Sequence, residues 1–322
     1  MKKILTGIKP TGEGLHIGNY FGAFKPLLDL AKGNKAYIFL ADYHSLTSVH
    51  NKENLQKFKK RMLIEYFSLI PEDSKIVVYE QSKVKNINNM TWILSSVTPY
   101  SLMLRAHTFK DSKTKNSDIN MATFNYPILM AADIISYDAD VVPVGKDQKQ
   151  HLEFARDIAE NFNKNYETDF FKLPDAGILK TVATIPGTDG RKMSKSYNNH
   201  IGIFDDEKTL KKKIMSIQTG SETLEEPKNP NTCNVFALIK LFADKQKTKE
   251  IKKKYLAGNY GYGHAKLELL DLILEYFKEP REKFKKFEAN FDLIEKKLEE
   301  GNKIANSEVD KKFAEIKEII GL

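Results

Sequence analysis

The sequence predicts an α/β fold, in which a doubly wound parallel sheet is followed by an all-helical C-terminal part. Two observations predict it. Short β-rich runs alternate with amphipathic helical patterns in the first two-thirds of the chain, and the strand signal stops after about residue 204. The chain has 322 residues, of which 41% are hydrophobic. Because such a chain can bury a sizeable core, we exclude disorder of the whole chain.

Four short runs rich in β-branched or aromatic residues are expected to be strands, at residues 3–8, 36–41, 75–79 and 140–144. Between the second and third runs, apolar residues of 55–69 recur at helical spacing, and residues 150–163 have one apolar face. Strand–helix–strand alternation predicts a parallel sheet with helices on both faces. In such sheets, ligands bind beyond the carboxyl ends of the strands.

Residues 205–322 are expected to form a separate helical domain. Lys/Glu-rich amphipathic patterns dominate this part, with breaks at residues 227–230, at residues 258–263 and at Pro280. We expect the last helix, at residues 310–320, to pack back onto the first domain.

Composition excludes several classes of protein. The single Cys233 rules out a disulfide scaffold and a cysteine zinc site, and it fits a reducing cytosol. No apolar run approaches the roughly 18–20 residues of a membrane span, and the N-terminus reaches a Gly/Pro turn too early for a signal peptide. We therefore expect a cytoplasmic protein that is not associated with a membrane. A net charge of +8 favours an anionic partner but does not identify one.

A glycine-rich turn follows the first expected strand, and a helix is expected to start near Leu15. The free N–H groups and positive dipole end of such a helix suit an anion. Gly18 permits close approach of a ligand or of backbone, and His16 and Asn19 share one helix face. Many α/β proteins need such a turn for structural reasons alone. Neither GxxxxGK[ST] nor GxGxxG occurs, which argues against a P-loop and a dinucleotide dehydrogenase.

A second loop carries lysines at residues 186–196. Gly187 and Gly190 supply conformational freedom, while Lys192 and Lys195 are compact charges that can follow moving phosphates. Single lysine pairs are common in so lysine-rich a chain. The five-residue string KMSKS at 192–196 is far less common by chance.

The two elements together resemble the signature motifs of class I aminoacyl-tRNA synthetases. The first reads HIGN at residues 16–19, where Asn19 replaces the second His of the family's HIGH, a variation common in the tryptophan and tyrosine subgroup. The opening turn TGIKPTG at 6–12 resembles that subgroup. The segments YPILMAADI at 126–134 and VPVGKDQKQH at 142–151 resemble bacterial tryptophanyl-tRNA synthetases closely. The likeness covers essentially the whole chain.

The resemblance implies a Rossmann-like catalytic domain at residues 1–204 and a helical tRNA anticodon-binding domain at 205–322. It implies a ligase that activates L-tryptophan with ATP, releases pyrophosphate, and transfers tryptophan to the 3′ end of tRNA(Trp). Mg²⁺ is expected to accompany the ATP phosphates, and a homodimer is expected in the cytoplasm. Trp92, the sole tryptophan, is expected in the core or at the subunit interface.

The residues expected to act on ATP follow from the matched motifs. His16, Asn19, Lys192 and Lys195 are the expected catalytic residues; no metal-ligating residue is expected. The full set of expected ATP-binding residues is Lys9, Pro10, Thr11, Gly18, Asn19, Gly145, Lys146, Asp147, Ile185, Lys192, Met193, Ser194, Lys195 and Ser196. Asp147 is expected to accept from the ribose hydroxyls, and Lys192 and Lys195 to hold pyrophosphate. Lys9 stands where relatives often have Gln, and the shifted lysine spacing at 109–113 leaves Lys113 without a role.

The expected tryptophan site centres on residues 126–133. If Pro127 opens a helix, Tyr126, Met130 and Asp133 fall on one face, and Asp133 can accept the indole N–H. The expected tryptophan-binding residues are Tyr126, Met130, Asp133, Gln148, His44, Val142 and Val144, with Phe39 as a further wall. Ordinary core packing is the alternative role for Met130. A helix cap or a buried ion pair is the alternative role for Asp133. This constellation does not separate tryptophan from tyrosine, since a phenol hydroxyl also donates to Asp.

Three other functions remain alternatives at the level of the sequence. These are a tyrosine–tRNA ligase, a non-catalytic RNA-binding homologue and a small nucleotidylyltransferase. The intact His16, Gly18, Lys192 and Lys195 argue against a protein without turnover. The long helical C-terminal part argues against a small nucleotidylyltransferase, whereas it suits an anticodon held far from the active site.

Overall fold

The computed structural model describes residues 1–10, 12, 14–106, 120–144, 149–178 and 184–322. Its described strands form a five-stranded sheet: β1 (Lys3–Ile8), β2 (Lys35–Leu40), β3 (Ile76–Glu80), β4 (Val141–Val144) and β5 (Asp175–Ile178). All paired strands are parallel. The four predicted strands are confirmed to within one residue at each end. Strand β5 was not predicted, because its sequence DAGI includes Asp and Gly, which are depleted in strands.

The strand order β3-β2-β1-β4-β5 explains where a ligand site should lie. The chain runs from β1 outward to β2 and β3, and then returns to add β4 on the other side of β1. The order therefore reverses between β1 and β4, and the crevice at their carboxyl ends is the usual ligand site in such sheets. The predicted doubly wound α/β class is confirmed.

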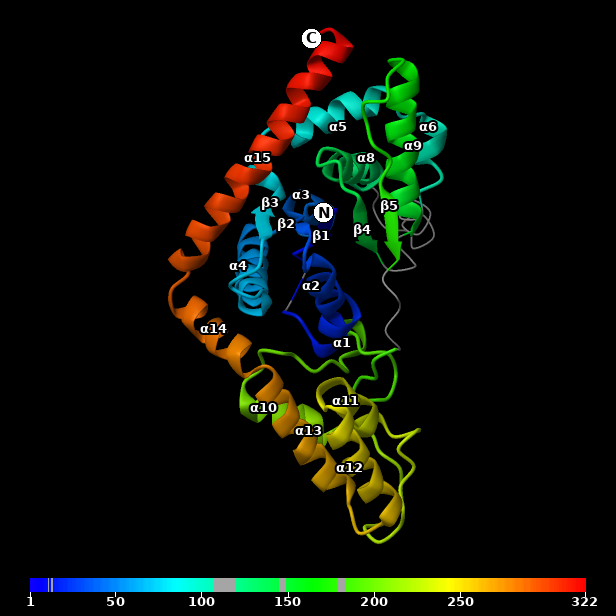
Figure 1. Ribbon diagram of the computed structural model, residues 1–322, viewed down its shortest axis with the longest axis vertical. Coiled ribbons are helices and arrows are strands. Elements are labelled where there is room, and N and C mark those ends of the chain that lie inside the picture. The colour runs from blue at the N-terminus through cyan, green and yellow to red at the C-terminus, as the bar shows by residue number, and fades with distance from the viewer. Residues whose placement is uncertain (11, 13, 107–119, 145–148, 179–183) are drawn as a thin grey trace.

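Helices cover both faces of the sheet (Figure 1). The helical elements described before residue 204 are α1 (Ile17–Asn19), η1 (Tyr20–Phe24), α2 (Lys25–Ala31), α3 (Asp42–Ser45), α4 (Lys52–Leu69), η2 (Gln81–Lys83), α5 (Ile87–Ser96), α6 (Tyr100–Met103), α8 (Met121–Ile135), α9 (Lys149–Asn165) and η4 (Lys195–Tyr197). The predicted helices at 55–69 and 150–163 correspond to α4 and α9. Both are slightly longer than their apolar pattern, because polar residues continue each helix.

The expectation that Pro127 opens a helix was wrong. Helix α8 begins at Met121, because Asn120 caps it by accepting a hydrogen bond from the Thr123 N–H at 2.9 Å. Pro127 therefore lies inside the helix, where its ring nitrogen has no N–H to donate. The i, i+4, i+7 relation of Tyr126, Met130 and Asp133 is unaffected, since all three remain within α8.

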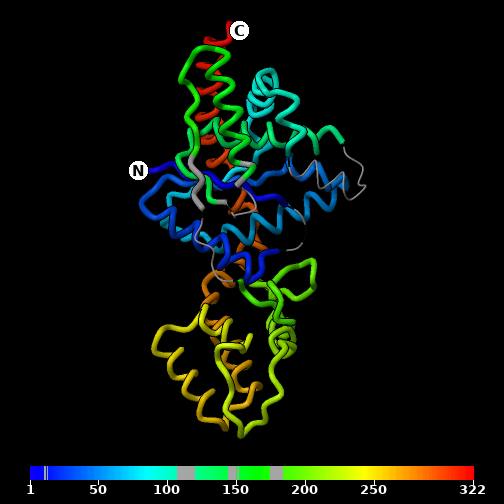
Figure 2. Tube along the Cα trace, turned by 90° about the vertical axis from the view of Figure 1, so that its right-hand side faces the viewer, coloured from blue at the N-terminus to red at the C-terminus, as the bar shows by residue number. Residues whose placement is uncertain are grey.

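After residue 204, the helices and strands of the described residues are all helices: α10 (Glu207–Met215), α11 (Asn234–Phe242), α12 (Lys245–Ala257), α13 (Tyr262–Tyr276), α14 (Lys278–Ala289) and α15 (Asp292–Ile320). Helices α10 to α13 form the end of the molecule remote from the sheet, and Figure 2 shows the same separation in a view turned by 90°. Within the described ranges, no helix has the length and apolar character needed to cross a membrane.

Helix α15 returns to the sheet and runs along its β3 edge (Figure 1). It begins at Asp292, well before the expected start at residue 310. A Cβ atom at Gly301 would lie 1.9 Å from the carbonyl oxygen of Val78, so glycine allows the helix to approach the strand closely. Glu308 adds ion pairs to Lys3 and Lys35, at 3.0 and 2.8 Å.

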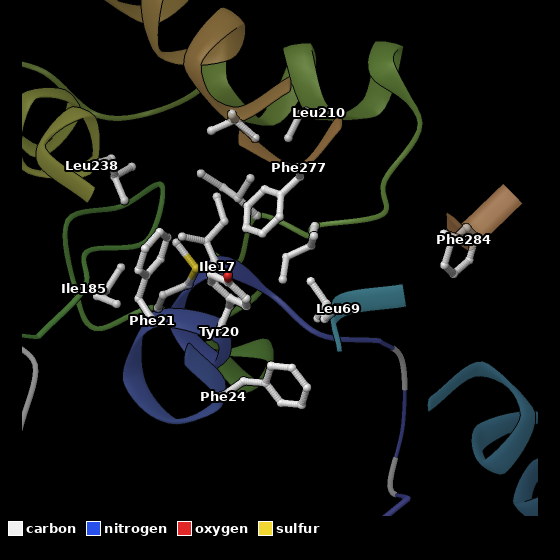
Figure 3. Packing of buried hydrophobic residues seen from close by; sticks show 14 of the residues in the cluster. Ile17, Tyr20, Phe21, Phe24, Leu69, Ile185, Leu210, Leu238, Phe277 and Phe284 are labelled. Carbon is white, nitrogen blue, oxygen red and sulfur yellow. The ribbon is translucent and has the colours of Figure 1, made fainter. Parts of the chain in front are cut away.

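Part of the core joins the glycine turn to the C-terminal helices. Ile17, Tyr20 and Phe21 follow the turn directly, and they pack among residues of the helical part (Figure 3). The rings of Tyr20 and Phe277 meet edge to face, with centroids 5.0 Å apart. The position of the turn is therefore fixed by residues from both parts of the chain.

Candidate active site

A cavity of about 340 Å³ lies at the carboxyl ends of β1 and β4, where the strand order reverses. Both sequence motifs reach it, because Asn19 of HIGN and Lys195 of KMSKS are among its lining residues. Lys9 and Gly14 line it from the glycine turn, and Pro143 lines it from β4. The two motifs therefore border one cavity, as shared contact with a single ligand requires.

His16 and Asn19 hold each other across the start of α1. The Nδ1 atom of His16 accepts a hydrogen bond from the Asn19 N–H at 3.2 Å, and the Oδ1 atom of Asn19 accepts from the His16 N–H. Since Nδ1 is an acceptor, Nε2 carries the proton of the neutral ring. Burial lowers the pKa of His16 to about 4, and the neighbouring His200 and Lys195 act in the same direction. His16 is therefore a neutral donor through Nε2 near pH 7.

The helix begins at Ile17, two residues after its expected start. The reason is that residues 15–17 first pair with residues 201–203. The Ile17 N–H donates to the Ile201 carbonyl at 3.0 Å, and the Ile203 N–H donates to the Leu15 carbonyl at 3.1 Å. The glycine turn is thus bonded to a segment that lies a few residues after KMSKS.

Gly18 and Met193 bring the two motifs into direct contact. The Gly18 N–H lies 3.3 Å from the Met193 sulfur, across 175 residues of sequence. A Cβ atom at Gly18 would lie 3.2 Å from Cβ of Met193 and 3.0 Å from the His16 ring. The close approach that Gly18 permits in this structure is therefore that of Met193 and His16.

Asn199 organises the lysine loop, although no sequence motif pointed to it. Its buried side chain accepts from the Ser194 N–H at 2.7 Å, and it donates to Asp189 at 2.7 Å and to the Lys192 carbonyl at 3.1 Å. These bonds join both ends of the loop, so Asn199 sets its shape. An asparagine just after KMSKS was the only available signal.

The predicted loop residues lie in different surroundings. Lys195 is half-buried and lines the cavity, whereas Lys192 and Ser196 are exposed and Ser194 is half-buried. The side chains of Ile185 and Met193 are buried in the core, and their backbones pair through a 2.8 Å hydrogen bond. Their side chains thus serve to pack the loop against the rest of the protein.

Lys9 and Pro10 lie at the start of the glycine turn. The Nζ atom of Lys9 donates to the Thr47 hydroxyl at 2.8 Å, and burial lowers the pKa of this lysine. Pro10 is buried. Four other predicted ATP-binding residues, Thr11, Gly145, Lys146 and Asp147, lie outside the described residues, as does Lys113.

Glu65 of α4 is a buried carboxylate that the sequence reasoning missed. It accepts from the Leu15 N–H at 2.5 Å and from Nε of Arg61 at 2.6 Å. A Cβ atom at Gly14 would lie 2.0 Å from its Oε1 atom. Burial raises the pKa of Glu65, although Arg61 and the Leu15 N–H work to lower it. An acid between the apolar residues 63–64 and 66 was the signal that could have identified it.

In the region predicted to bind tryptophan, Asp133 is 2% exposed and is held by two side chains. The Nε2 atom of His44 lies 2.9 Å from its Oδ2, and the Gln81 amide donates to both oxygens at 2.9 and 2.7 Å. Burial raises the pKa of Asp133, while His44 and Gln81 work to lower it. Gln81 was missed, although its place directly after a strand, at the carboxyl edge of the sheet, was a usable signal.

The structure brings several predicted tryptophan-site residues close to Asp133. The ring of Tyr126 meets that of His44 edge-on, with centroids 6.1 Å apart, and Met130 is half-buried on the same helix as Asp133. Phe39 and Val142 are buried in the same core cluster as Ile134. Gln148 and the side chain of Val144 lie outside what the structure describes.

Comparison with known proteins identifies the family. Residues 1–278 match the tRNA synthetases of class I for tryptophan and tyrosine (W and Y). A tryptophan–tRNA ligase of Fusobacterium nucleatum is 50% identical over 322 residues, which are 100% of this chain and 98% of that protein. The chain belongs to the tryptophanyl-tRNA synthetases. The family resemblance predicted from the motifs is therefore confirmed.

Solved structures of tryptophanyl-tRNA synthetases agree with the fold. The Campylobacter jejuni enzyme, solved as a complex with ADP and tryptophan, superimposes with a TM-score of 0.94. It is 44% identical, and the match covers 99% of this chain and 100% of that one. A tyrosyl-tRNA synthetase of Archaeoglobus fulgidus shares the fold with a TM-score of 0.63, at only 19% identity.

Proposed function

We propose that this chain is a tryptophan–tRNA ligase that forms tryptophanyl-adenylate from L-tryptophan and ATP and then esterifies tRNA(Trp). The observation that carries the proposal is the contact between HIGN and KMSKS beside one cavity at the strand-order reversal. Neither step requires a nucleophile from the protein. The protein accelerates the reaction by positioning the reactants and by stabilising charge on the phosphate oxygens.

On the nucleotide side, the proposal places the phosphates near the donors that the two motifs supply. His16 donates through Nε2, and Asn19 donates through its side-chain amide because its Oδ1 already accepts from the His16 backbone. Lys195 supplies a positive charge at the cavity wall, and the exposed Lys192 follows the departing pyrophosphate. Lys9, Pro10, Ser194 and Ser196 remain proposed ATP contacts, as do Thr11, Gly145, Lys146 and Asp147.

Magnesium enters as part of the ATP substrate. Among the described residues, no three His, Cys, Asp or Glu side chains gather in a way that could hold a metal ion. The described residues that line the cavity include lysines but neither Asp nor Glu. Mg²⁺ favours oxygen ligands and commonly binds through substrate phosphates. The proposed ion is therefore carried by the triphosphate.

On the amino-acid side, Asp133 accepts the indole N–H of tryptophan. His44 and Gln81 both donate to this carboxylate, yet each carboxylate oxygen has further acceptor capacity. The nearby Met130 is proposed to supply thioether surface, with Val142, Val144 and Phe39 as walls. Tyr126 and Gln148 are proposed to hold the ammonium group.

The helical part, residues 205–322, is proposed to bind the anticodon of tRNA(Trp), and the ligase is placed in the cytoplasm with its tRNA substrate. A homodimer is proposed through the surface formed by α5, α6 and α8. Trp92, Tyr100 and Met121 on these helices are 79%, 70% and 67% exposed. Exposed apolar side chains of this size mark interaction surfaces.

ATP–pyrophosphate exchange with each of the twenty amino acids, run separately, tests the proposal. Exchange that depends on tryptophan alone is expected. Exchange that depends on tyrosine would establish the tyrosine alternative, and no exchange with any amino acid would support a non-catalytic homologue.

A further inference from the structure

Lys59 of α4 joins two buried acids at the carboxyl edge of the sheet. Its Nζ atom lies 2.6 Å from Oδ2 of Asp42 and 2.8 Å from Oε1 of Glu80. The side chains are 22%, 5% and 11% exposed, respectively. Asp42 also accepts from the Ser82 N–H at 2.9 Å and from the Ser82 hydroxyl at 2.5 Å. We call Lys59, Asp42, Glu80 and Ser82 the lysine clamp.

The clamp is adjacent in sequence to the two residues that hold Asp133. Asp42 follows β2 and precedes His44 by two residues, while Glu80 ends β3 and directly precedes Gln81. The two segments are also joined directly, because the Tyr43 N–H donates to the Gln81 side-chain oxygen at 3.1 Å. Any shift between the ends of β2 and β3 would therefore move His44 and Gln81 relative to Asp133.

Electrostatics makes Lys59 necessary for this arrangement. Two carboxylates that face each other in a poorly solvated place repel, unless a cation compensates them. Burial works to lower the pKa of Lys59, but the hydrogen bonds and charges of Asp42 and Glu80 outweigh it and leave the pKa raised. Lys59 is therefore charged near pH 7, and it holds the two strand ends together.

We infer that Lys59 is a positioning residue for tryptophan, which acts by fixing the His44 and Gln81 donors on Asp133. The inference rests on the proposed function, because it takes Asp133 to contact the substrate indole. Neither Lys59 nor its two acids line the cavity proposed for the nucleotide. Loss of Lys59 should therefore weaken tryptophan use and leave ATP use nearly unchanged.

The Lys59→Met variant tests this, because it removes the charge and keeps most of the side-chain volume. In ATP–pyrophosphate exchange, the KM for tryptophan is expected to rise about tenfold to hundredfold, as displacements of about 1 Å in positioned groups produce. The KM for ATP should change less than about twofold. Lys57→Met, at an exposed position on the same helix, is the matched control and should behave like the parent. Lys59→Arg keeps the charge and should recover part of the loss.

Chemical rescue distinguishes positioning from a general structural role. Lys59 and Glu80 also line a surface cavity of about 950 Å³, through which a small cation can reach the gap left by Lys59→Ala. Propylammonium, with three N–H donors, is expected to lower the raised KM for tryptophan toward the parent value. Tetramethylammonium has the same charge but no N–H, and it should have no effect.

Several results would overturn the inference. A folded Lys59→Met variant with unchanged kinetics would do so, as would equal increases in the KM for tryptophan and for ATP. If Lys59→Met does not fold, Ser82→Ala provides the test, because it removes only the hydroxyl that donates to Asp42. A raised KM for tryptophan in that variant supports the inference, and an unchanged one contradicts it. A parent protein without tryptophan-dependent exchange would instead overturn the proposed function.

Discussion

In the region proposed for the nucleotide, main-chain hydrogen bonds join the glycine turn to a distant segment, whereas the region proposed for the amino acid is built from side chains that bond to one buried acid. Residues 15–17 pair with residues 201–203, and Gly18 touches Met193. By contrast, Asp133 depends on hydrogen bonds from the side chains of His44 and Gln81. The contacts of residues 15–18 place the two motifs together, and the Nε2 atom of His16 and the side-chain amide of Asn19 keep donor capacity for phosphates. Side-chain contacts instead fix one acceptor, and they make it sensitive to distant substitutions.

The largest expected effect on the nucleotide side is that of Lys195→Ala. It removes a lysine that lines the cavity, and loss of one stabilising donor typically lowers a rate by about 10²–10³. Adenylate formation should fall on that scale in ATP–pyrophosphate exchange, while equilibrium binding of tryptophan should stay nearly unchanged. Lys211→Ala, at an exposed position of α10, is the control. Parent-like exchange by Lys195→Ala would remove the loop from the mechanism.

Asp133→Asn is the corresponding change on the amino-acid side. It removes the charge of an acceptor, and a hydrogen bond to a charged group contributes about 1.5–3 kcal/mol. The value of kcat/KM for tryptophan should fall about tenfold to hundredfold, with the KM for ATP little changed. Unchanged tryptophan kinetics would show that Asp133 does not contact the indole. An equal loss in kcat/KM for ATP would show that the substitution does not act on tryptophan alone.

Gly14→Ala should have a smaller effect, on the region proposed for the nucleotide. The added Cβ would meet the Glu65 carboxylate, whose Oε1 lies 2.0 Å from that position, so the turn or Glu65 must shift. Overpacking of this kind typically costs about 1–3 kcal/mol of stability. We expect a lower melting temperature in calorimetry and a raised KM for ATP, with the KM for tryptophan retained. Gly263→Ala is the control, because a Cβ there meets no atom within 4 Å.

The smallest expected effect concerns pH. Because the pKa of His16 falls to about 4 in the folded protein, the unfolded chain binds more protons at this residue between about pH 4 and pH 6.5. The contribution of His16 to stability therefore falls as pH decreases through this range. Its slope is at most about 1.4 kcal/mol per pH unit. The free energy of unfolding, measured by urea denaturation, should depend less on pH in His16→Gln than in the parent.

Sequence reasoning worked where the signal is local. The strand at residues 3–8 is a short β-rich run bounded by a turn, and the structure has the same bounds. HIGN and KMSKS are contiguous strings, so both could be found without knowing the fold. The start of α8 was missed because Pro127 seemed a better boundary than Asn120, which caps the helix.

Residues that support the site were harder to find, since their partners lie far away in the sequence. Glu65 bonds to Leu15 across 50 residues, and Gln81 bonds to Asp133 across 52. Neither pair has a spacing that a local pattern could reveal. The catalytic and binding roles of the predicted residues remain predictions that the variants above address. The division of the chain at residue 204 also remains a prediction.

Helix α15 has a consequence for attempts to shorten the protein. It lies along β3, the outermost strand on its side of the sheet, at a distance that Gly301 makes possible. A chain that ends before Asp292 would leave the hydrogen-bonding groups of that strand open to solvent. Open strands recruit other strands, so such a fragment should self-associate and precipitate. The C-terminal residues thus protect the sheet from aggregation.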